Sequence, residues 1–87
     1  MADGKITGAN VRRDEVVGWA VEVSYYYTAL GEYYGGKYRR TFRRKTSAQA
    51  FAERFPKQMP VPVRYKPERP QVSTLLLSDL SLYLAGL

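Results

Sequence analysis

The chain has 87 residues, with 14 Lys and Arg against 8 Asp and Glu, and a net charge of +6. It contains no His and no Cys, which excludes disulfide bonds, Cys-based metal sites and catalysis by a His base or a Cys thiolate. The length fits one domain, residues 1–87, and eight Tyr favour a sheet. We expect no metal site and no cofactor.

The first half of the chain has the pattern of long strands. Residues 1–4 should be a frayed terminus, a short strand covers residues 6–11, and residues 12–15 form a charged turn. Apolar and aromatic residues then recur at every second position: Val17, Trp19, Val21, Val23, Tyr25 and Tyr27. Residues at this spacing share one face of a strand. We therefore predict that Trp19 faces the core and that Trp19→Ala costs about 3–5 kcal/mol.

Gly31 marks the turn that follows, because glycine readily takes the positive φ that a tight hairpin loop needs. The loop is either residues 30–31 or residues 31–32. Both choices place odd positions of the first long strand opposite even positions of the second. Glu22 lies directly opposite Arg39 with the first loop and diagonally from it with the second.

The second long strand, residues 33–45, should have two different faces. Its inner face adds aromatic residues to the core: Tyr34, Tyr38 and Phe42. Its outer face, together with two tyrosines, is a candidate surface for an anionic partner: Lys37, Arg39, Arg43, Lys45, Tyr26 and Tyr33. A solvated face, an anionic membrane surface and a nucleic acid remain the alternatives for this basic stripe.

The spacing of apolar residues changes to a helical period after residue 45. Thr46 and Gln49 match a capping box, with Thr46 as the N-cap, and Pro56 ends the predicted helix. Two shorter strands follow, at residues 61–65 and 72–77, joined by a rigid Pro-x-x-Pro connector. The chain should thus be an α+β domain of order β-β-β-α-β-β, in which an antiparallel twisted sheet or partly open small barrel of four to five strands carries one short helix.

The C-terminal segment, residues 78–87, is apolar and is too short to span a bilayer. Three interpretations remain open: it closes the core, it forms a dimer interface, or it is part of a longer membrane segment. Leucines on one helical face are candidates for self-association as a homodimer: Leu76, Leu80, Leu84 and Leu87. The chain shows neither a signal peptide nor a complete transmembrane span, so we expect a cytoplasmic or membrane-associated location.

The order of these features resembles a bacterial family of domains of unknown function, family 3592. The resemblance rests on three tyrosines at residues 25–27 before Gly31, on Val-x-Val-x-Tyr at residues 61–65, and on Pro-x-x-Pro at residues 67–70. It covers about residues 6–76. Members are often found next to transmembrane helices, so the resemblance implies a small β-rich domain near a membrane, with no catalytic residue to assign.

We therefore expect a non-enzymatic module, either a membrane-proximal accessory domain or a protein-interaction domain. Its partner should be an anionic membrane surface or another protein. The alternative is a small nucleic-acid-binding domain that uses the basic hairpin face. An enzyme is not expected, because no predicted face gathers a pair of acids in a cleft.

Overall fold

The computed structural model describes residues 2–75. It contains five strands and one helix in the predicted order β-β-β-α-β-β: β1 (Ala2–Asp14), β2 (Gly18–Ala29), β3 (Glu32–Phe42), α1 (Lys45–Glu53), β4 (Pro60–Lys66) and β5 (Arg69–Thr74). The domain is mostly β-structure, so the predicted α+β class holds only loosely, through the single nine-residue helix.

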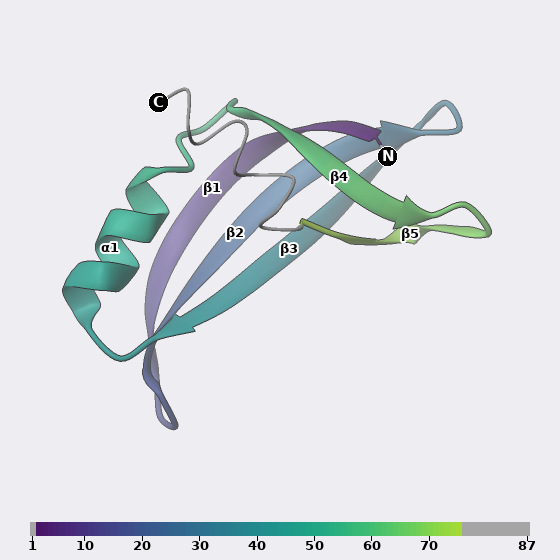
Figure 1. Cartoon of the computed structure of the whole chain (residues 1–87). Helices are drawn as coiled ribbons and strands as arrows, with labels where there is room; N and C mark the ends of the chain where they lie inside the picture. The colour runs from purple at the N-terminus through teal and green to yellow at the C-terminus, as the bar shows by residue number, and fades with distance from the viewer. Residues whose placement is uncertain (1, 76–87) are drawn as a thin grey trace.

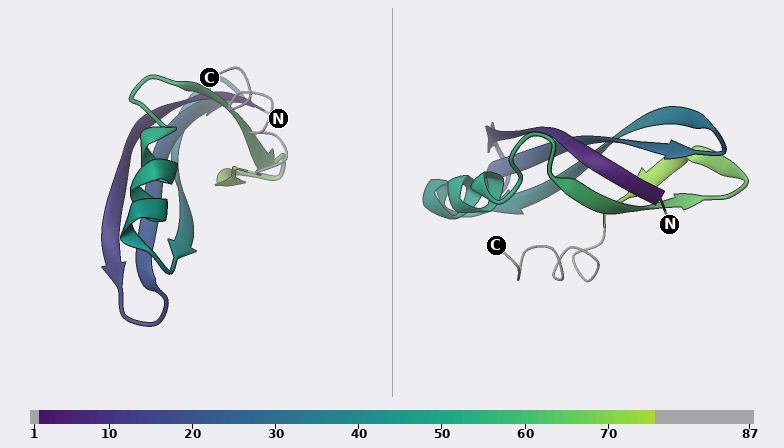
Figure 2. Two further views of the ribbon diagram at one scale, coloured as in Figure 1. Left: turned by 60° about the vertical axis from the view of Figure 1, so that its left-hand side comes forward. Right: turned by 90° about the horizontal axis from the view of Figure 1, so that it is seen from above.

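The five strands form one antiparallel sheet in the order β3-β2-β1-β4-β5. The sheet curls so strongly that β5 returns to contact β3, which makes a nearly closed barrel (Figure 1). Figure 2 shows α1 on the concave side of the sheet, where it packs against β1, β2 and β3. Two tyrosine hydroxyls of β2 reach across to β5: Tyr25 lies 3.0 Å from Ser73 Oγ, and Tyr27 donates to the carbonyl of Pro70.

The hairpin of β2 and β3 has the first of the two predicted loops. Leu30 and Gly31 have φ values of 53° and 81°, the left-handed conformation that a two-residue hairpin loop requires at both positions. Ala29 therefore pairs with Glu32, and the register continues along the whole hairpin. The inner and outer faces of β3 are those that the sequence predicts.

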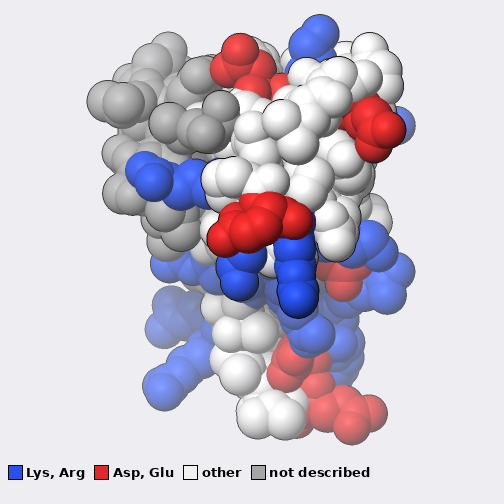
Figure 3. All heavy atoms as spheres, turned by 90° about the vertical axis from the view of Figure 1, so that its right-hand side faces the viewer, with Lys and Arg blue, Asp and Glu red and all other residues white. Residues whose placement is uncertain are grey.

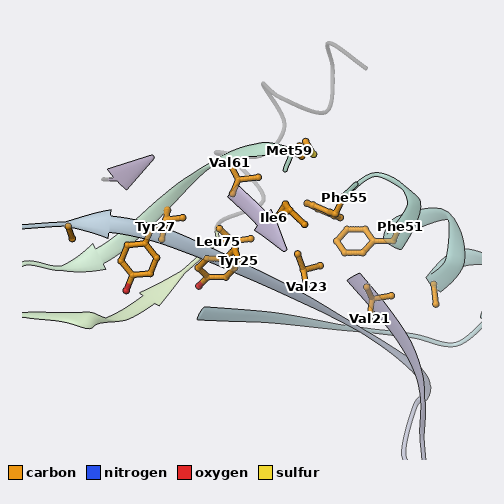
Figure 4. Packing of buried hydrophobic residues seen from close by; sticks show 13 residues of the cluster. Ile6, Val21, Val23, Tyr25, Tyr27, Phe51, Phe55, Met59, Val61 and Leu75 are labelled. Carbon is orange, nitrogen blue, oxygen red and sulfur yellow. The ribbon is translucent and has the colours of Figure 1, made fainter. Parts of the chain in front are cut away.

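The core lies inside the curled sheet and consists of side chains from β1, β2, β4, α1 and the segments that follow α1 and β5. Its largest fully buried residues are Tyr25, Tyr27, Phe55, Ile6, Leu75, Val21, Val23, Val61 and Val63 (Figure 4). The alternation in β2 supplies the centre, because every second residue from Val21 to Ala29 is buried. Among residues 2–75 the buried core holds no charged side chain.

The prediction for the N-terminus is wrong. Residues 2–5 are not frayed, because they pair with residues 60–63 of β4 and make β1 thirteen residues long. The strand also continues through the predicted charged turn as far as Asp14. The turn lies at residues 15–17 instead.

The inward-facing residues of β2 begin at Trp19, whereas the predicted alternation begins two residues earlier, at Val17. Val17 belongs to the turn and is 39% exposed. Trp19 pairs with Phe42 and packs against the core from its edge while remaining partly exposed. The predicted direction of the indole ring is confirmed, but its central position is not, so Trp19→Ala should cost less than the removal of a fully buried aromatic residue.

The predicted capping box is also wrong. Arg44 occupies the N-cap position without a side-chain hydrogen bond, and Thr46 lies inside the first helical turn. The helix is held by packing instead, because Ala48 and Phe51 are buried against the sheet. Phe55 follows the helix and fills the core from the same side.

Two other boundaries differ from the prediction. β3 ends at Phe42, three residues before the predicted end of its strand, and β5 begins at Arg69, directly after a turn at Pro67 and Glu68. The predicted self-association residues lie outside the described residues: Leu76, Leu80, Leu84 and Leu87.

Candidate anionic-partner surface

Four of the six predicted surface residues lie together on the outer face of the β2–β3 hairpin: Tyr26, Tyr33, Lys37 and Arg39. The rings of Tyr26 and Tyr33 are tilted against each other with centroids 6.2 Å apart. Tyr33 is 77% exposed, so one face of this aromatic pair is available to a ligand. This part of the predicted site is brought together as the alternation in the hairpin requires.

Both cations of this outer face already have acidic partners. Lys37 Nζ lies 3.5 Å from a carboxylate oxygen of Glu22, and Arg39 donates a hydrogen bond to Asp14. The two acids are more buried than the cations, with side chains 25% and 13% exposed. The outer face therefore offers less free positive charge than its sequence suggests.

Asp14 is also the residue that shapes the turn between β1 and β2. Its Oδ1 accepts hydrogen bonds from the backbone N–H groups of Val16 (2.9 Å) and Val17 (2.8 Å). These bonds, and then the charge of Arg39, lower the pKa of the Asp14 carboxyl below its ordinary value. At pH values above the ordinary pKa of an Asp carboxyl, the ionised Asp14 stabilises the fold. This stabilisation is lost as the pH falls through the lowered pKa of Asp14.

The other two predicted cations, Arg43 and Lys45, do not continue this face. The strand ends at Phe42, so the alternation that was extended to them stops. Lys45 is the first residue of α1, and its Nζ lies 5.2 Å from the centre of the Trp19 ring, on the inner side. The predicted four-cation stripe is therefore not one surface.

A second group of cations surrounds the aromatic residues at the end of the barrel that holds the β1–β2 turn and the β3–α1 connection. We call it the basic end: Arg13, Arg40, Arg43, Arg44 and Lys45. In Figure 3 blue spheres lie across the middle of the molecule and on its flanks, and white and red spheres make up its lowest part.

Cation–π contacts hold part of the basic end in place. The guanidinium carbon of Arg13 lies 5.8 Å from the centre of the Trp19 ring. The guanidinium of Arg40 lies 5.2 Å from the ring centres of both Phe42 and Phe51. These contacts orient the cations without neutralising them, because a cation over an aromatic face keeps its full charge.

The basic end also differs from the outer face in its lack of acidic partners. Within residues 2–75 the ion pairs involve Lys37 and Arg39, and none involves a residue of the basic end. A shallow groove of about 280 Å³ lies beside it, lined by Phe42, Phe51 and Arg54 among others. Of these five cations the sequence prediction had placed Lys45 on the outer face, whereas its Nζ lies over the Trp19 ring on the inner side.

A sequence model described as "Domain of unknown function (DUF3592)" matches residues 2–79 of the chain. The chain belongs to this family. The match confirms the resemblance seen in the sequence, and the family's description assigns no activity to a DUF3592 domain. No curated protein and no solved structure shows a significant match.

The helix at residues 45–53 is too short and too polar to cross a membrane, and residues 2–75 contain no other helix. Within the same residues no three acidic side chains come together as a group that could hold a metal ion.

Proposed function

We propose that this domain is a non-enzymatic accessory module that works next to a membrane and binds its anionic surface through the basic end. The observation that supports the proposal most directly is the group of five cations at one end of the barrel, which have no acidic partner among residues 2–75. The outer hairpin face, where two cations are held by acids, contributes less to binding.

The magnitude of this attraction suits weak, reversible binding. A Lys or Arg close to an anionic leaflet contributes about 1 kcal/mol at physiological ionic strength, so a few such residues give useful affinity but no permanent anchor. The attraction decays over a Debye length of about 8–10 Å. Because the domain is 39 Å long, cations at its far end contribute little when the basic end faces the bilayer.

A test of this proposal changes Arg43 and Arg44, which are exposed and form no ion pair within the described residues. The double variant Arg43→Gln/Arg44→Gln should weaken binding to vesicles of phosphatidylcholine and phosphatidylserine by about 25-fold. Co-sedimentation at physiological salt measures the partition coefficient directly.

The matched control removes the two cations that flank the turn between β4 and β5, by Lys66→Gln/Arg69→Gln. It has the same net charge as the test variant, but the changes lie away from the basic end (Figure 1), so binding should change less than threefold. Equal losses for the two variants would mean that net charge alone, not the basic end, determines binding. Equal partitioning of the unchanged domain into neutral and anionic vesicles would remove the proposal.

Nucleic acid is the second candidate, and the pair of Tyr26 and Tyr33 is the observation that favours it. An exposed aromatic ring beside Lys37 could stack an unpaired base, a contact worth about 1–3 kcal/mol. On this hypothesis a labelled single strand binds at low salt, weakens as salt rises, and binds Tyr33→Ala about tenfold less well. An affinity that does not change with salt concentration, or the absence of binding at low salt, would reject nucleic-acid binding.

A further inference from the structure

We infer that the β1–β2 turn, residues 15–17, is a membrane-docking tip that places Val16 and Val17 in the interfacial layer of an anionic bilayer. The inference rests on the proposed function and adds to it the part of the chain that enters the lipid. It concerns an apolar contact, whereas the proposed function concerns charge, so the two can fail separately.

The tip exposes apolar side chains in a fixed conformation. Val16 is 93% exposed and Val17 is 39% exposed, although both are apolar residues that are usually buried. The hydrogen bonds from their backbone N–H groups to Asp14 hold the turn in this shape. The two valines are therefore presented to the outside without a loss of chain entropy on binding.

The residues next to the tip are arranged as an interfacial segment requires. Trp19 lies two residues after Val17, about 7 Å along the strand at the usual rise of roughly 3.3 Å per residue. Amphipathic segments bury their apolar side about 5–10 Å below the headgroup boundary. When the valines reach that depth, Trp19 lies at the level of the headgroups, where tryptophan is enriched in membrane proteins.

Cations lie at the same level as Trp19. Arg13 and Lys45 contact its ring, as described above, and the backbone of Arg43 borders the base of the turn. The carbonyl of Arg43 lies 3.3 Å from the position that a Cβ on Gly18 would occupy. Phosphate groups of anionic lipids would meet these three cations while the tip contacts the acyl boundary.

The acids of the tip do not outweigh these cations. Asp14 is engaged by Arg39 and by two backbone N–H groups, which leaves Glu15 as the acid of the turn without an ion pair among the described residues. A protein partner is less suited to this tip, because a stable protein interface buries about 1,200–2,000 Å², far more than two valines can offer. A bilayer requires no such shape-matched area.

The experiment compares the domain with its variant Val16→Ser/Val17→Ser on vesicles of phosphatidylcholine and phosphatidylserine. Trp19 is the single tryptophan of the chain, so its fluorescence reports on this end alone. On binding, emission of the unchanged domain should shift to the blue, and lipids brominated near the headgroup should quench it. The double variant should bind about tenfold more weakly and lose most of the shift.

Two further variants control the result. Leu30→Ser removes a 73% exposed apolar residue from the turn at the opposite end of β2, and its binding should be unchanged. Glu15→Lys should increase binding about fivefold to tenfold. Val16 and Val17 lie outside the core, so all variants should melt at about the temperature of the unchanged domain.

Each outcome decides between the two proposals. If the unchanged domain binds anionic vesicles but the valine variant binds equally well, with Trp19 emission unaltered on binding, the docking tip is wrong and the proposed function stands. If neither the unchanged domain nor Glu15→Lys binds, both proposals are wrong.

Discussion

Tyr27→Ala should destabilise the domain by about 3–5 kcal/mol, enough to unfold a marginally stable chain of this size. The Tyr27 side chain is fully buried. Its ring stacks on those of Tyr34 and Tyr65 at centroid distances of 5.7 and 6.1 Å. It therefore joins β3 to β4 through β2, and its removal opens a cavity at the point where the barrel nearly closes. Urea denaturation followed by tryptophan fluorescence measures the free energy of unfolding.

Two variants separate the roles of this side chain. Tyr27→Phe keeps the ring but removes the hydroxyl that donates to the Pro70 carbonyl, and should cost about 1–3 kcal/mol. Tyr33→Ala, at an exposed position of the same hairpin, should change stability by less than about 0.5 kcal/mol. A Tyr27→Ala domain that unfolds cooperatively at the midpoint of the unchanged domain would contradict this packing.

The features of the fold that could be predicted are those encoded locally. The alternation in β2 fixed its inner face, Gly31 fixed the hairpin turn, and Pro56 follows a helical spacing of apolar residues. β1 could not be delimited in this way. Its first residues include Gly4 and Lys5, and they become a strand only because residues 60–63 pair with them across the barrel. Such pairing between distant segments has no local sequence signal.

The predicted surface differs from the structure where β3 ends. The predicted stripe assumed that the strand continues to Lys45, so that each second cation stays on one face. The helix begins at that residue, which turns Lys45 toward Trp19 and leaves Arg43 beside the base of the β1–β2 turn. The ion pair of Arg39 with Asp14 could not be predicted from the sequence either. The two residues are far apart in the chain and meet only because β1, β2 and β3 pair side by side.

The residues that stabilise the fold are separate from those of the proposed binding surface. The basic end and the docking tip lie beyond the core, on one end of a barrel held by β2 and its buried tyrosines. Changes at Val16 or Arg43 can therefore alter binding without unfolding the domain, whereas changes at Tyr27 remove the scaffold itself. Comparing the stability and the vesicle binding of these two groups of variants tests whether binding and folding depend on separate residues.

Gly36→Ala should destabilise the domain by about 1–3 kcal/mol, because the site has no room for a methyl group. A Cβ on Gly36 would lie 2.5 Å from ring atoms of Tyr25, its cross-strand partner. The ring cannot move away easily, because Tyr25 is 2% exposed and its hydroxyl is hydrogen-bonded to Ser73. Because Tyr25 packs over Gly36, the ring could move away from a new methyl group only if the contact between Tyr25 in β2 and Ser73 in β5 were loosened.

The neighbouring residue provides the matched control for this prediction. A Cβ on Gly35 would lie 3.9 Å from the Tyr25 carbonyl oxygen, an ordinary van der Waals distance, and Gly35 has no positive φ that would strain an alanine. Gly35→Ala should leave stability unchanged or raise it by up to about 1 kcal/mol, because alanine restricts the unfolded chain. Thermal melts of both variants measure the difference. Equal melting temperatures would show that Tyr25 does not pack over Gly36, and the closure of the barrel through Tyr25 and Ser73 would then be wrong.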